Sequence, residues 1–292
     1  MTTIEAAQSI CNSWSSLTDN VNWEAIKSFA NSPFMISLIG AFAGAFAGAV
    51  GAQHIAERSK HREEMLSEMR NTNAAIALTF GVCNSLLALK KQHVKSLKER
   101  YEAQQAKLQE FRRKRNEGEV QLDVALQCQF DMQTLQFQAL PMDTLRAVVF
   151  ERLSIVGRPL NLVVALTQSV QCLEDSLTKR NTLIEGYKTE FAKDNQGLAT
   201  LYFGLPYGEG HVNLDYPGTI NAIYNQTDDG IFFGNLLCKD LHEHGKQLSG
   251  VFKKKFKNDP PSISEVDFAS ATSLMPDETN YADWVKAFVK KL

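Results

Sequence analysis

The sequence predicts a mainly α-helical protein with one N-terminal transmembrane helix and a minor β element. Residues 33–52 form an uncharged apolar run of about the length of one membrane crossing. Two long stretches further on repeat their apolar residues at helical spacing, whereas residues 120–137 alternate with a period of two. The composition of the whole chain, with 44% hydrophobic and 22% charged residues, is ordinary for a globular protein. The net charge of −2 gives no overall attraction to nucleic acid.

We expect three parts along the 292 residues. The expected parts are an extracytoplasmic or interfacial segment 1–32, a transmembrane helix 33–52, and a cytoplasmic, mainly helical domain 53–292. Within this domain we expect long helices at 53–116 and 159–194 and a C-terminal subregion 195–292. The five cysteines form no CxxC pair, so the pattern favours free thiols in a reducing compartment.

The apolar run 33–52 reads PFMISLIGAFAGAFAGAVGA. At 1.5 Å per residue its length matches a hydrocarbon core roughly 30 Å thick. Pro33 suits the first position of a helix, with Asn31 and Ser32 before it as cap candidates. Two other interpretations are open. One is a signal peptide cleaved near Ala52, although the preceding 32 residues are long and acidic for such a leader. The other is a buried core helix.

Small residues recur on one face of this helix. Gly40, Gly44 and Gly48 are spaced by four, with Ala41 and Ala45 beside them. Membrane helices with such a face pack closely against a neighbouring helix, because small side chains let the two backbones approach. We therefore expect the lipid bilayer and further copies of this chain as partners.

Basic residues predict the orientation of the expected span. Lys27 is the only lysine or arginine before it, whereas Arg58, Lys60 and Arg62 follow soon after it. Because Lys and Arg concentrate on the cytoplasmic side, we expect a single-pass protein with its N-terminus outside and its C-terminal domain in the cytoplasm.

A coiled-coil-like stripe runs through the expected helix 53–116. Its positions are Met69, Asn73, Ile76, Phe80, Cys83, Leu87, Lys90, Val94, Leu97, Tyr101, Gln104, Leu108 and Phe111. A second apolar stripe marks 159–194, so we expect the two helices to form an antiparallel hairpin within one chain. Pairing between chains is the alternative. The apolar run 74–89 is short for a span and is expected to be a buried helix. If it crosses the membrane instead, the predicted orientation of the C-terminal domain reverses.

Later segments predict smaller elements. The alternation over 120–137 indicates a strand or hairpin arm. Residues 195–218 are rich in Gly and Tyr and are expected to form a structured loop. Helices are expected at about 218–226 and 230–257, and a last amphipathic helix at about 277–291.

No catalytic, phosphate-loop or metal-binding signature occurs in the chain, so we expect no enzyme activity, no cofactor and no metal. His242 and His244 lie two residues apart, and on a helix such side chains point apart rather than toward one metal. An enzyme with the Tyr/Gly loop as its active site is the remaining possibility. It would need Tyr207 and His211 to line a cleft with a carboxylate such as Asp215.

Three weaker patterns are candidate ligand sites. Lys246, Lys253 and Lys254 belong to a lysine-rich helix end interleaved with Phe252 and Phe256, which could neutralise phosphates. The Tyr/Gly loop, with Tyr207 and His211, offers aromatic faces for a base. Arg112 and Arg113 could bind an anion. Each also has a structural explanation, since cations stabilise helix C-termini and such a loop can simply be packed.

The glycine-spaced segment, its basic flank at Arg58, Lys60 and Arg62 and the helical body together resemble bacterial anti-phage effectors. The likeness is architectural and includes no specific binding motif. It implies an oligomeric pore or ion channel of the bacterial inner membrane, gated by a nucleotide or oligonucleotide signal from a partner enzyme. The alternative is a non-conducting scaffold or adaptor that is tethered to the membrane and holds a protein partner through its long helices.

Overall fold

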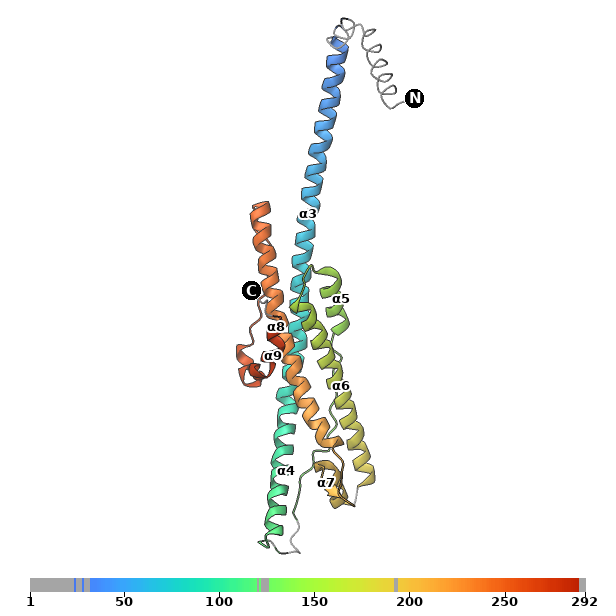
Figure 1. Ribbon diagram of the computed structural model, residues 1–292, viewed down its shortest axis with the longest axis vertical. Coiled ribbons are helices and arrows are strands. Elements are labelled where there is room, and N and C mark those ends of the chain that lie inside the picture. Colours follow the sequence, from blue (N-terminus) through green and yellow to red (C-terminus); the bar gives the residue numbers. More distant parts are fainter. Residues whose placement is uncertain are drawn as a thin grey trace, which may run out of the picture. The chain divides into compact units, whose positions relative to one another are not determined.

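The computed structural model describes residues 32–119, 121, 126–191 and 194–288, together with Glu24 and Ser28. Most of the expected segment 1–32 thus lies outside the described residues. The chain divides into two compact units, Met1–Glu63 and Glu64–Leu292. Its elements (Figure 1) are α3 (Pro33–Leu89), the π-helical turn η1 (Lys90–Val94), α4 (Lys95–Asn116), α5 (Met142–Arg152), α6 (Arg158–Glu190), α7 (Asn195–Phe203), β1 (Pro206–Tyr207), β2 (His211–Val212), α8 (Asp215–Phe256), the 3₁₀ turns η2 (Ala269–Leu274) and η3 (Glu278–Tyr281), and α9 (Ala282–Lys286). The prediction of a mainly helical protein is confirmed.

The described part of the first unit is dominated by the beginning of α3. The Ser32 hydroxyl accepts a hydrogen bond from the backbone N–H of Met35 at 3.2 Å, which satisfies one of the free donors of the first turn. Pro33 opens the helix, where its missing N–H costs nothing. Every residue from 40 to 60 is exposed within the single chain. The segment 33–52 is therefore helical as predicted, and from residue 40 onward its side chains are uncovered.

The second unit is built on three long helical stretches. One comprises the later part of α3, η1 and α4, and the others are α6 and α8. Ser249 contacts Met69 at 3.6 Å, whereas Lys98 donates to Asn221 much earlier in α8. Residue numbers thus rise along one stretch while they fall along the other, so α8 is antiparallel to α3 and α4. α8 is also one continuous helix where two were expected.

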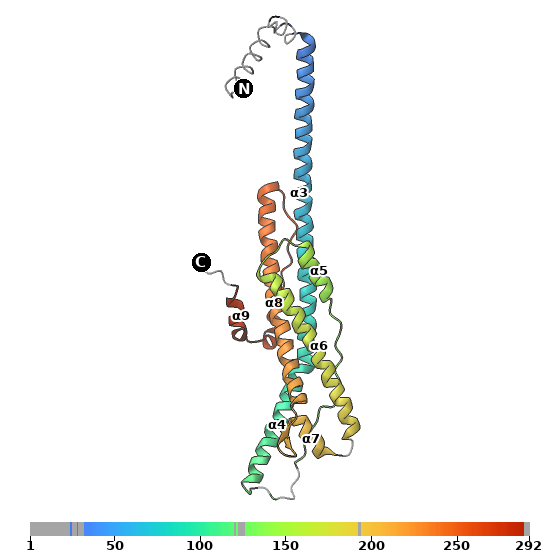
Figure 2. The ribbon, with the colours of Figure 1, turned by 45° about the vertical axis from the view of Figure 1, so that its right-hand side comes forward.

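α6 runs parallel to α3 and α4, so the predicted antiparallel hairpin is wrong. One core cluster joins residues 75–94 to Leu162–Leu177 of α6, and the next joins Leu97 and Tyr101 to Ile184 and Tyr187. Figures 1 and 2 show the two stretches side by side with the same direction. The antiparallel partner of both is α8, against which α6 packs extensively.

The reason lies in the connection between α4 and α6. Described residues 126–140, here called the return segment, are neither helix nor strand. Fifteen extended residues reach roughly 50 Å, so the return segment can carry the chain back along the bundle. Apolar stripes show which helices can pack together, but they do not encode direction. Direction is decided by this connection.

The predicted stripe from Met69 to Phe111 is a buried face of the second unit. Eight of its positions are 0–8% exposed, and all of them except Cys83 belong to the three core clusters: Met69, Ile76, Cys83, Leu87, Val94, Leu97, Tyr101 and Leu108. Lys90 is also buried, and it pairs with Asp228 and donates to the carbonyl oxygen of Leu274 at 2.8 Å. Asn73, Gln104 and Phe111 are half-buried. Phe80 is 39% exposed, with its ring 5.7 Å from Phe268. The stripe therefore packs within the chain.

The expected β element around 120–137 is not a strand in the described residues of that region. The alternation is real, because Leu126, Cys128 and Phe130 are partly buried while Gln127 and Gln129 are exposed. However, the described chain has no second strand beside the return segment. The only strand pair in the described chain is the short antiparallel hairpin β1–β2, in register Tyr207↔His211.

Helix side chains take the place of the missing strand. Asn181 accepts from the N–H of Leu135 at 2.9 Å and donates to its carbonyl at 2.6 Å, as a neighbouring strand would. Arg180 donates to the carbonyl of Gln133 at 2.7 Å. Tyr202 accepts from the N–H of Asp131 at 3.0 Å. An extended chain can therefore lie on helices because its buried polar groups find side-chain partners.

The C-terminal residues pack on α3 and α8 with less helix than the predicted 277–291. Asn73 holds the segment by donating to Ser262 at 2.9 Å and accepting from Ser264 at 2.8 Å. The Tyr281 ring stacks on Phe232 at 3.8 Å. Only the short α9 follows, and residues 289–292 lie outside the described chain.

Candidate functional site

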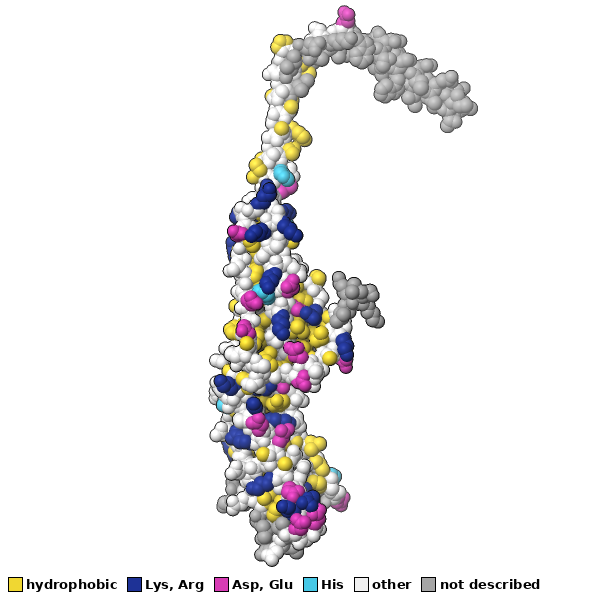
Figure 3. Space-filling view, turned by 90° about the vertical axis from the view of Figure 1, so that its left-hand side faces the viewer, with side chains coloured by type: hydrophobic (Ala, Val, Ile, Leu, Met, Phe, Trp, Pro, Cys, Tyr) yellow, Lys and Arg dark blue, Asp and Glu magenta, His cyan; other side chains and the backbone are white. Residues whose placement is uncertain are grey.

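The first candidate site is the uncovered apolar surface of α3 in the first unit. Phe42, Phe46 and Ile55 are 69%, 73% and 71% exposed, values unusual for large apolar side chains. Figure 3 shows hydrophobic side chains on the surface of this segment. Exposed apolar surface of this extent marks a contact with a membrane or a partner.

The two sides of this segment differ in size. A methyl group added at Gly40, Gly44 or Gly48 would meet nothing within 4 Å, and Ala41 and Ala45 are exposed beside them. Because successive residues turn by about 100°, Phe42 and Phe46 project from nearly the opposite side. The helix thus presents a flat strip of small residues and a ridge of large ones.

Within the described chain, one helical stretch, Gly40–Asn116, is long and apolar enough to cross a membrane. An apolar part of 18 residues within this stretch has a mean hydropathy of 1.5, and 44% of that part is buried. Every residue from 40 to 60 is exposed, so this partly buried part lies further along the helix, in the second apolar run 74–89. There Ile76, Val82 and Leu86 are in the core while Ala74 and Ala77 are exposed. The second run is therefore half-covered by the chain itself.

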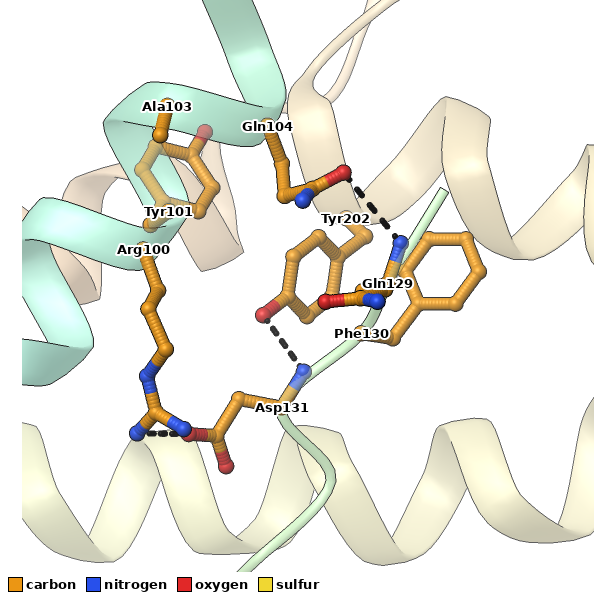
Figure 4. Close-up of a pocket in the computed structure, with 8 residues that line it drawn as sticks. All are labelled: Arg100, Tyr101, Ala103, Gln104, Gln129, Phe130, Asp131 and Tyr202. Carbon is orange, nitrogen blue, oxygen red and sulfur yellow. Dashed lines mark hydrogen bonds and ion pairs between the residues drawn. The ribbon is translucent and has the colours of Figure 1, made fainter. Parts of the chain in front are cut away.

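The second candidate site is a cavity of about 180 Å³ in the second unit, between α4, the return segment and α7 (Figure 4). Its lining residues are Arg100, Tyr101, Ala103, Gln104, Gln129, Phe130, Asp131 and Tyr202. The rings of Phe130 and Tyr202 meet edge to face at 5.1 Å, and those of Tyr101 and Tyr202 are 5.8 Å apart. Gln104 accepts from the backbone N–H of Gln129 at 3.3 Å, which ties the return segment to α4.

Three charged side chains lead from this cavity to the buried interior. The Asp131 carboxylate lies 2.9 Å from the Arg100 guanidinium and 3.5 Å from that of Arg180. The Arg100 side chain is 65% exposed, whereas that of Arg180 is fully buried. The Nε atom of Arg180 is buried without a hydrogen-bond partner in the described chain, although its guanidinium lies 5.8 Å from the Tyr216 ring. Two cations and one carboxylate leave this region with one excess positive charge.

The tyrosines of this region are hydrogen-bonding groups rather than bases. Burial raises the pKa of Tyr101 to about 12 and also raises the pKa of Tyr202. Both phenols therefore keep their protons at neutral pH. With aromatic walls, two carboxamides and an exposed guanidinium, the cavity is suited to one planar polar ring attached to an anionic group. Ligand pockets usually exceed 300 Å³, so there is room for little more than one ring.

The predicted residues of the Tyr/Gly loop lie outside this cavity. The rings of Tyr207 and His211 face each other across the β1–β2 hairpin at 6.2 Å, and both side chains are exposed. Asp215 pairs with Lys179 at 2.7 Å instead of joining them. Backbone geometry accounts for the glycines, since Gly208 and Gly210 have φ of 54° and 95° in the turn.

The predicted basic residues form two separate groups. Arg112 and Arg113 lie near the C-terminal end of α4, where Arg113 pairs with Glu110 at 2.8 Å and with Glu117. Lys246, Lys253 and Lys254 lie toward the C-terminal end of α8. Figures 1 and 2 place these helix ends at opposite ends of the second unit. The β1–β2 hairpin lies beside α7, so the structure does not bring it together with the lysines.

The cavity residues were not among the residues predicted for a site. Tyr101 and Gln104 were assigned to the stripe, and Phe130 to the buried face of a strand. Asp131 occupies a polar position of the alternating segment, between Phe130 and Met132, which predicts an exposed side chain, but in the structure it is only 15% exposed. The arginines that face it come from distant segments and carry no sequence pattern.

Among the described residues, no group of three His, Cys, Asp or Glu side chains is placed to hold a metal ion. His242 contacts the carbonyl of Ser264 at 2.9 Å, whereas His244 contacts Glu68 at 3.1 Å, so the two rings point to different partners. No protein family model, characterised protein or solved structure matches the chain.

Proposed function

We propose that this chain is a single-pass membrane effector that assembles through the small-residue face of α3. The observation that carries the proposal is the uncovered apolar surface of the first unit, including Phe42 and Phe46 at 69% and 73% exposure. Leaving such side chains in water is unfavourable by roughly 25 cal/mol per Å² of apolar area. A bilayer covers the large side chains, and a second copy covers the glycine strip.

The same segment is uncharged from residue 33 to residue 56 and is followed by Arg58, Lys60 and Arg62. These residues favour a cytoplasmic second unit and an external N-terminus in a bacterial inner membrane. The run 74–89 is an unfavourable second span, because its inner face already belongs to the core of the second unit.

We propose further that the assembled helices line a pore. One thin helix cannot enclose a channel, whereas a closed ring of copies can, with glycines allowing close approach in the shut state. Purified chain reconstituted into dye-loaded vesicles should release dye when nucleoside monophosphates or short oligonucleotides are added, and Gly44→Leu should abolish this release. Phe46→Leu on the opposite side is the matched control and should retain it. If the wild-type chain inserts but the vesicles stay intact, with or without these ligands, the pore hypothesis is rejected and only a membrane tether remains.

The signal in this proposal is a nucleotide or oligonucleotide, and the cavity beside Arg100 is its candidate site. A base fits the space between the aromatic walls, and the exposed guanidinium can pair with a phosphate. Titration with nucleoside monophosphates and short oligonucleotides should give binding that Arg100→Gln weakens. Arg146→Gln, an exposed arginine on α5, should leave it unchanged. Equal affinities in both variants would exclude this cavity.

The scaffold alternative loses its expected docking helix, because the stripe that would hold a partner is packed inside the chain. The scaffold alternative predicts that the chain inserts into vesicles without dye release, and that Gly44→Leu does not change its insertion.

A further inference from the structure

The last turns of α8 carry a surface that neither the core nor the cavity uses. Its members are Lys246, Lys253, Lys254 and Lys255 on the helix and Lys257 at the C-cap, and all five are exposed. Positions 246, 253, 254 and 257 are separated by seven, one and three residues, so they follow one side of a helix. We call these five residues the lysine surface.

Most of these cations have no acidic partner. Lys253 pairs with Asp259 at 3.0 Å, but both side chains are well exposed at 69% and 88%. For the other four lysines, no ion pair or side-chain hydrogen bond occurs in the described part of the chain. Favourable interaction with the helix dipole explains cations in the last turn only. It does not account for Lys246, which lies well before the end of α8.

Packing holds this surface in a fixed orientation. Phe252 and Phe256 are 1% and 8% exposed and pack on Met65 and Met69 of α3. Each phenylalanine therefore points inward while the lysines beside it point outward. Val251, at 53% exposure, is an apolar side chain among the outward lysines. The result is a rigid basic surface with one exposed apolar residue.

The same packing decides between kinds of polyanion. Binding of single-stranded nucleic acid uses aromatic side chains on which bases stack, and here both phenylalanines are buried. The exposed lysines that remain can recognise only the charge of phosphate groups. Phosphate groups displayed on a plane, beside apolar chains that can accept Val251, are a property of a membrane surface.

We propose that the lysine surface binds the anionic headgroups of the bilayer in which the chain is anchored. This inference rests on the proposed membrane function and deepens it, because it gives the second unit its own contact with lipid. Met65, which contacts this end of α8, follows the expected span by only thirteen residues. The contact weakens with salt, since exposed charges are screened within about 10 Å at moderate ionic strength.

Lysine acetylation of the full chain in nanodiscs tests the proposal. Mass spectrometry compares labelling of Lys254, Lys255 and Lys257 in discs of zwitterionic lipid with labelling in discs that contain phosphatidylglycerol. Labelling should fall several-fold in the anionic discs and recover at high salt. Lys91 and Lys95, exposed near the middle of the second unit, serve as internal controls and should not change.

Equal labelling in both lipids overturns the proposal. Protection that appears in zwitterionic discs only on adding inorganic phosphate or a short RNA also overturns it, because those outcomes assign the surface to a soluble ligand. If the chain does not insert into discs at all, the proposed membrane span fails instead. In that case anionic vesicles added to the soluble chain still decide the question, since protection there supports lipid binding and its absence rejects it.

Discussion

The two halves of α3 are both regular helix, but the first is exposed whereas the inner face of the second is buried in the core. From residue 40 to residue 60 every position is exposed, including Phe42 and Phe46. From Met69 onward the inner face of the same helix is in the core, with Ile76 and Val82 at 1% and 0% exposure. Within the described chain, the core covers the inner face of the later half, whereas the large apolar side chains of the earlier half are exposed.

This difference separates two arguments for assembly that look equivalent in the sequence. The heptad-like stripe over 69–111 suggests intermolecular pairing, but α6 and α8 already cover it. The glycine strip has no such cover, because a methyl group at Gly44 would meet nothing within 4 Å. We therefore attribute the proposed oligomer to the glycine strip and not to the stripe over 69–111.

Gly44→Leu should give the largest effect, complete loss of self-association in detergent. A leucine side chain keeps two backbones from approaching where glycine allows it. Native mass spectrometry should change from an oligomer to a monomer, while Phe46→Leu retains the oligomer. A Gly44→Leu chain that still assembles would show that the interface lies elsewhere.

Leu173→Ala probes the covered region. Leu173 is 0% exposed in the core of the second unit, so the variant should lose about 2–5 kcal/mol of unfolding free energy. Phe46→Ala removes a larger side chain that is 73% exposed and should leave the unfolding of the second unit unchanged. Urea titration followed by circular dichroism measures both. Equal losses of unfolding free energy in the two variants would contradict the difference in burial between Leu173 and Phe46.

Asn181→Leu tests the return segment with a smaller expected effect. It removes both hydrogen bonds to Leu135 and leaves two backbone groups without partners, which should cost about 1–3 kcal/mol. Thr182→Ala, next in the chain and exposed, is the control. If the two variants unfold at the same urea concentration, the return segment is not held by Asn181.

Two carboxylates should give small pH effects of opposite sign. Burial raises the pKa of Asp229, although the hydrogen bond from Tyr281 lowers it. The folded state therefore binds this proton more tightly than the unfolded state, and its contribution to stability is lost as the pH rises through the folded pKa. Asp229→Asn should thus raise the melting temperature at neutral pH, with the gain fading toward pH 4.

For Glu68, burial raises the pKa but hydrogen bonds from Ser154 and His244 outweigh it, so the net pKa is lowered. Its stabilising contribution is present above the unfolded pKa and is lost as the pH falls through the folded one. Glu68→Gln should lower the melting temperature at neutral pH, with the loss fading in acid. Melting curves of both variants across this range would contradict the assignment if their shifts had the same sign.

Local patterns predicted the helices well, because apolar spacing directly reflects a buried face. They did not predict the direction in which each helix runs or which helices pack together. α6 turned out parallel because residues 126–140 return along the bundle, and the strand expected there is absent because Asn181 and Arg180 satisfy its backbone. The cavity could not be predicted, since Arg100, Asp131 and Tyr202 come from three segments with no shared motif.

Extraction of cell membranes with alkaline carbonate tests the central claim most directly, that the uncovered half of α3 lies in a bilayer. Carbonate strips peripheral proteins and leaves inserted helices in the pellet. The wild-type chain should stay in the pellet, and Phe42→Asp with Phe46→Asp should move it to the supernatant, because each aspartate near the centre of a span costs about 2.5–3.5 kcal/mol. Release of the wild-type chain into the supernatant would contradict the account.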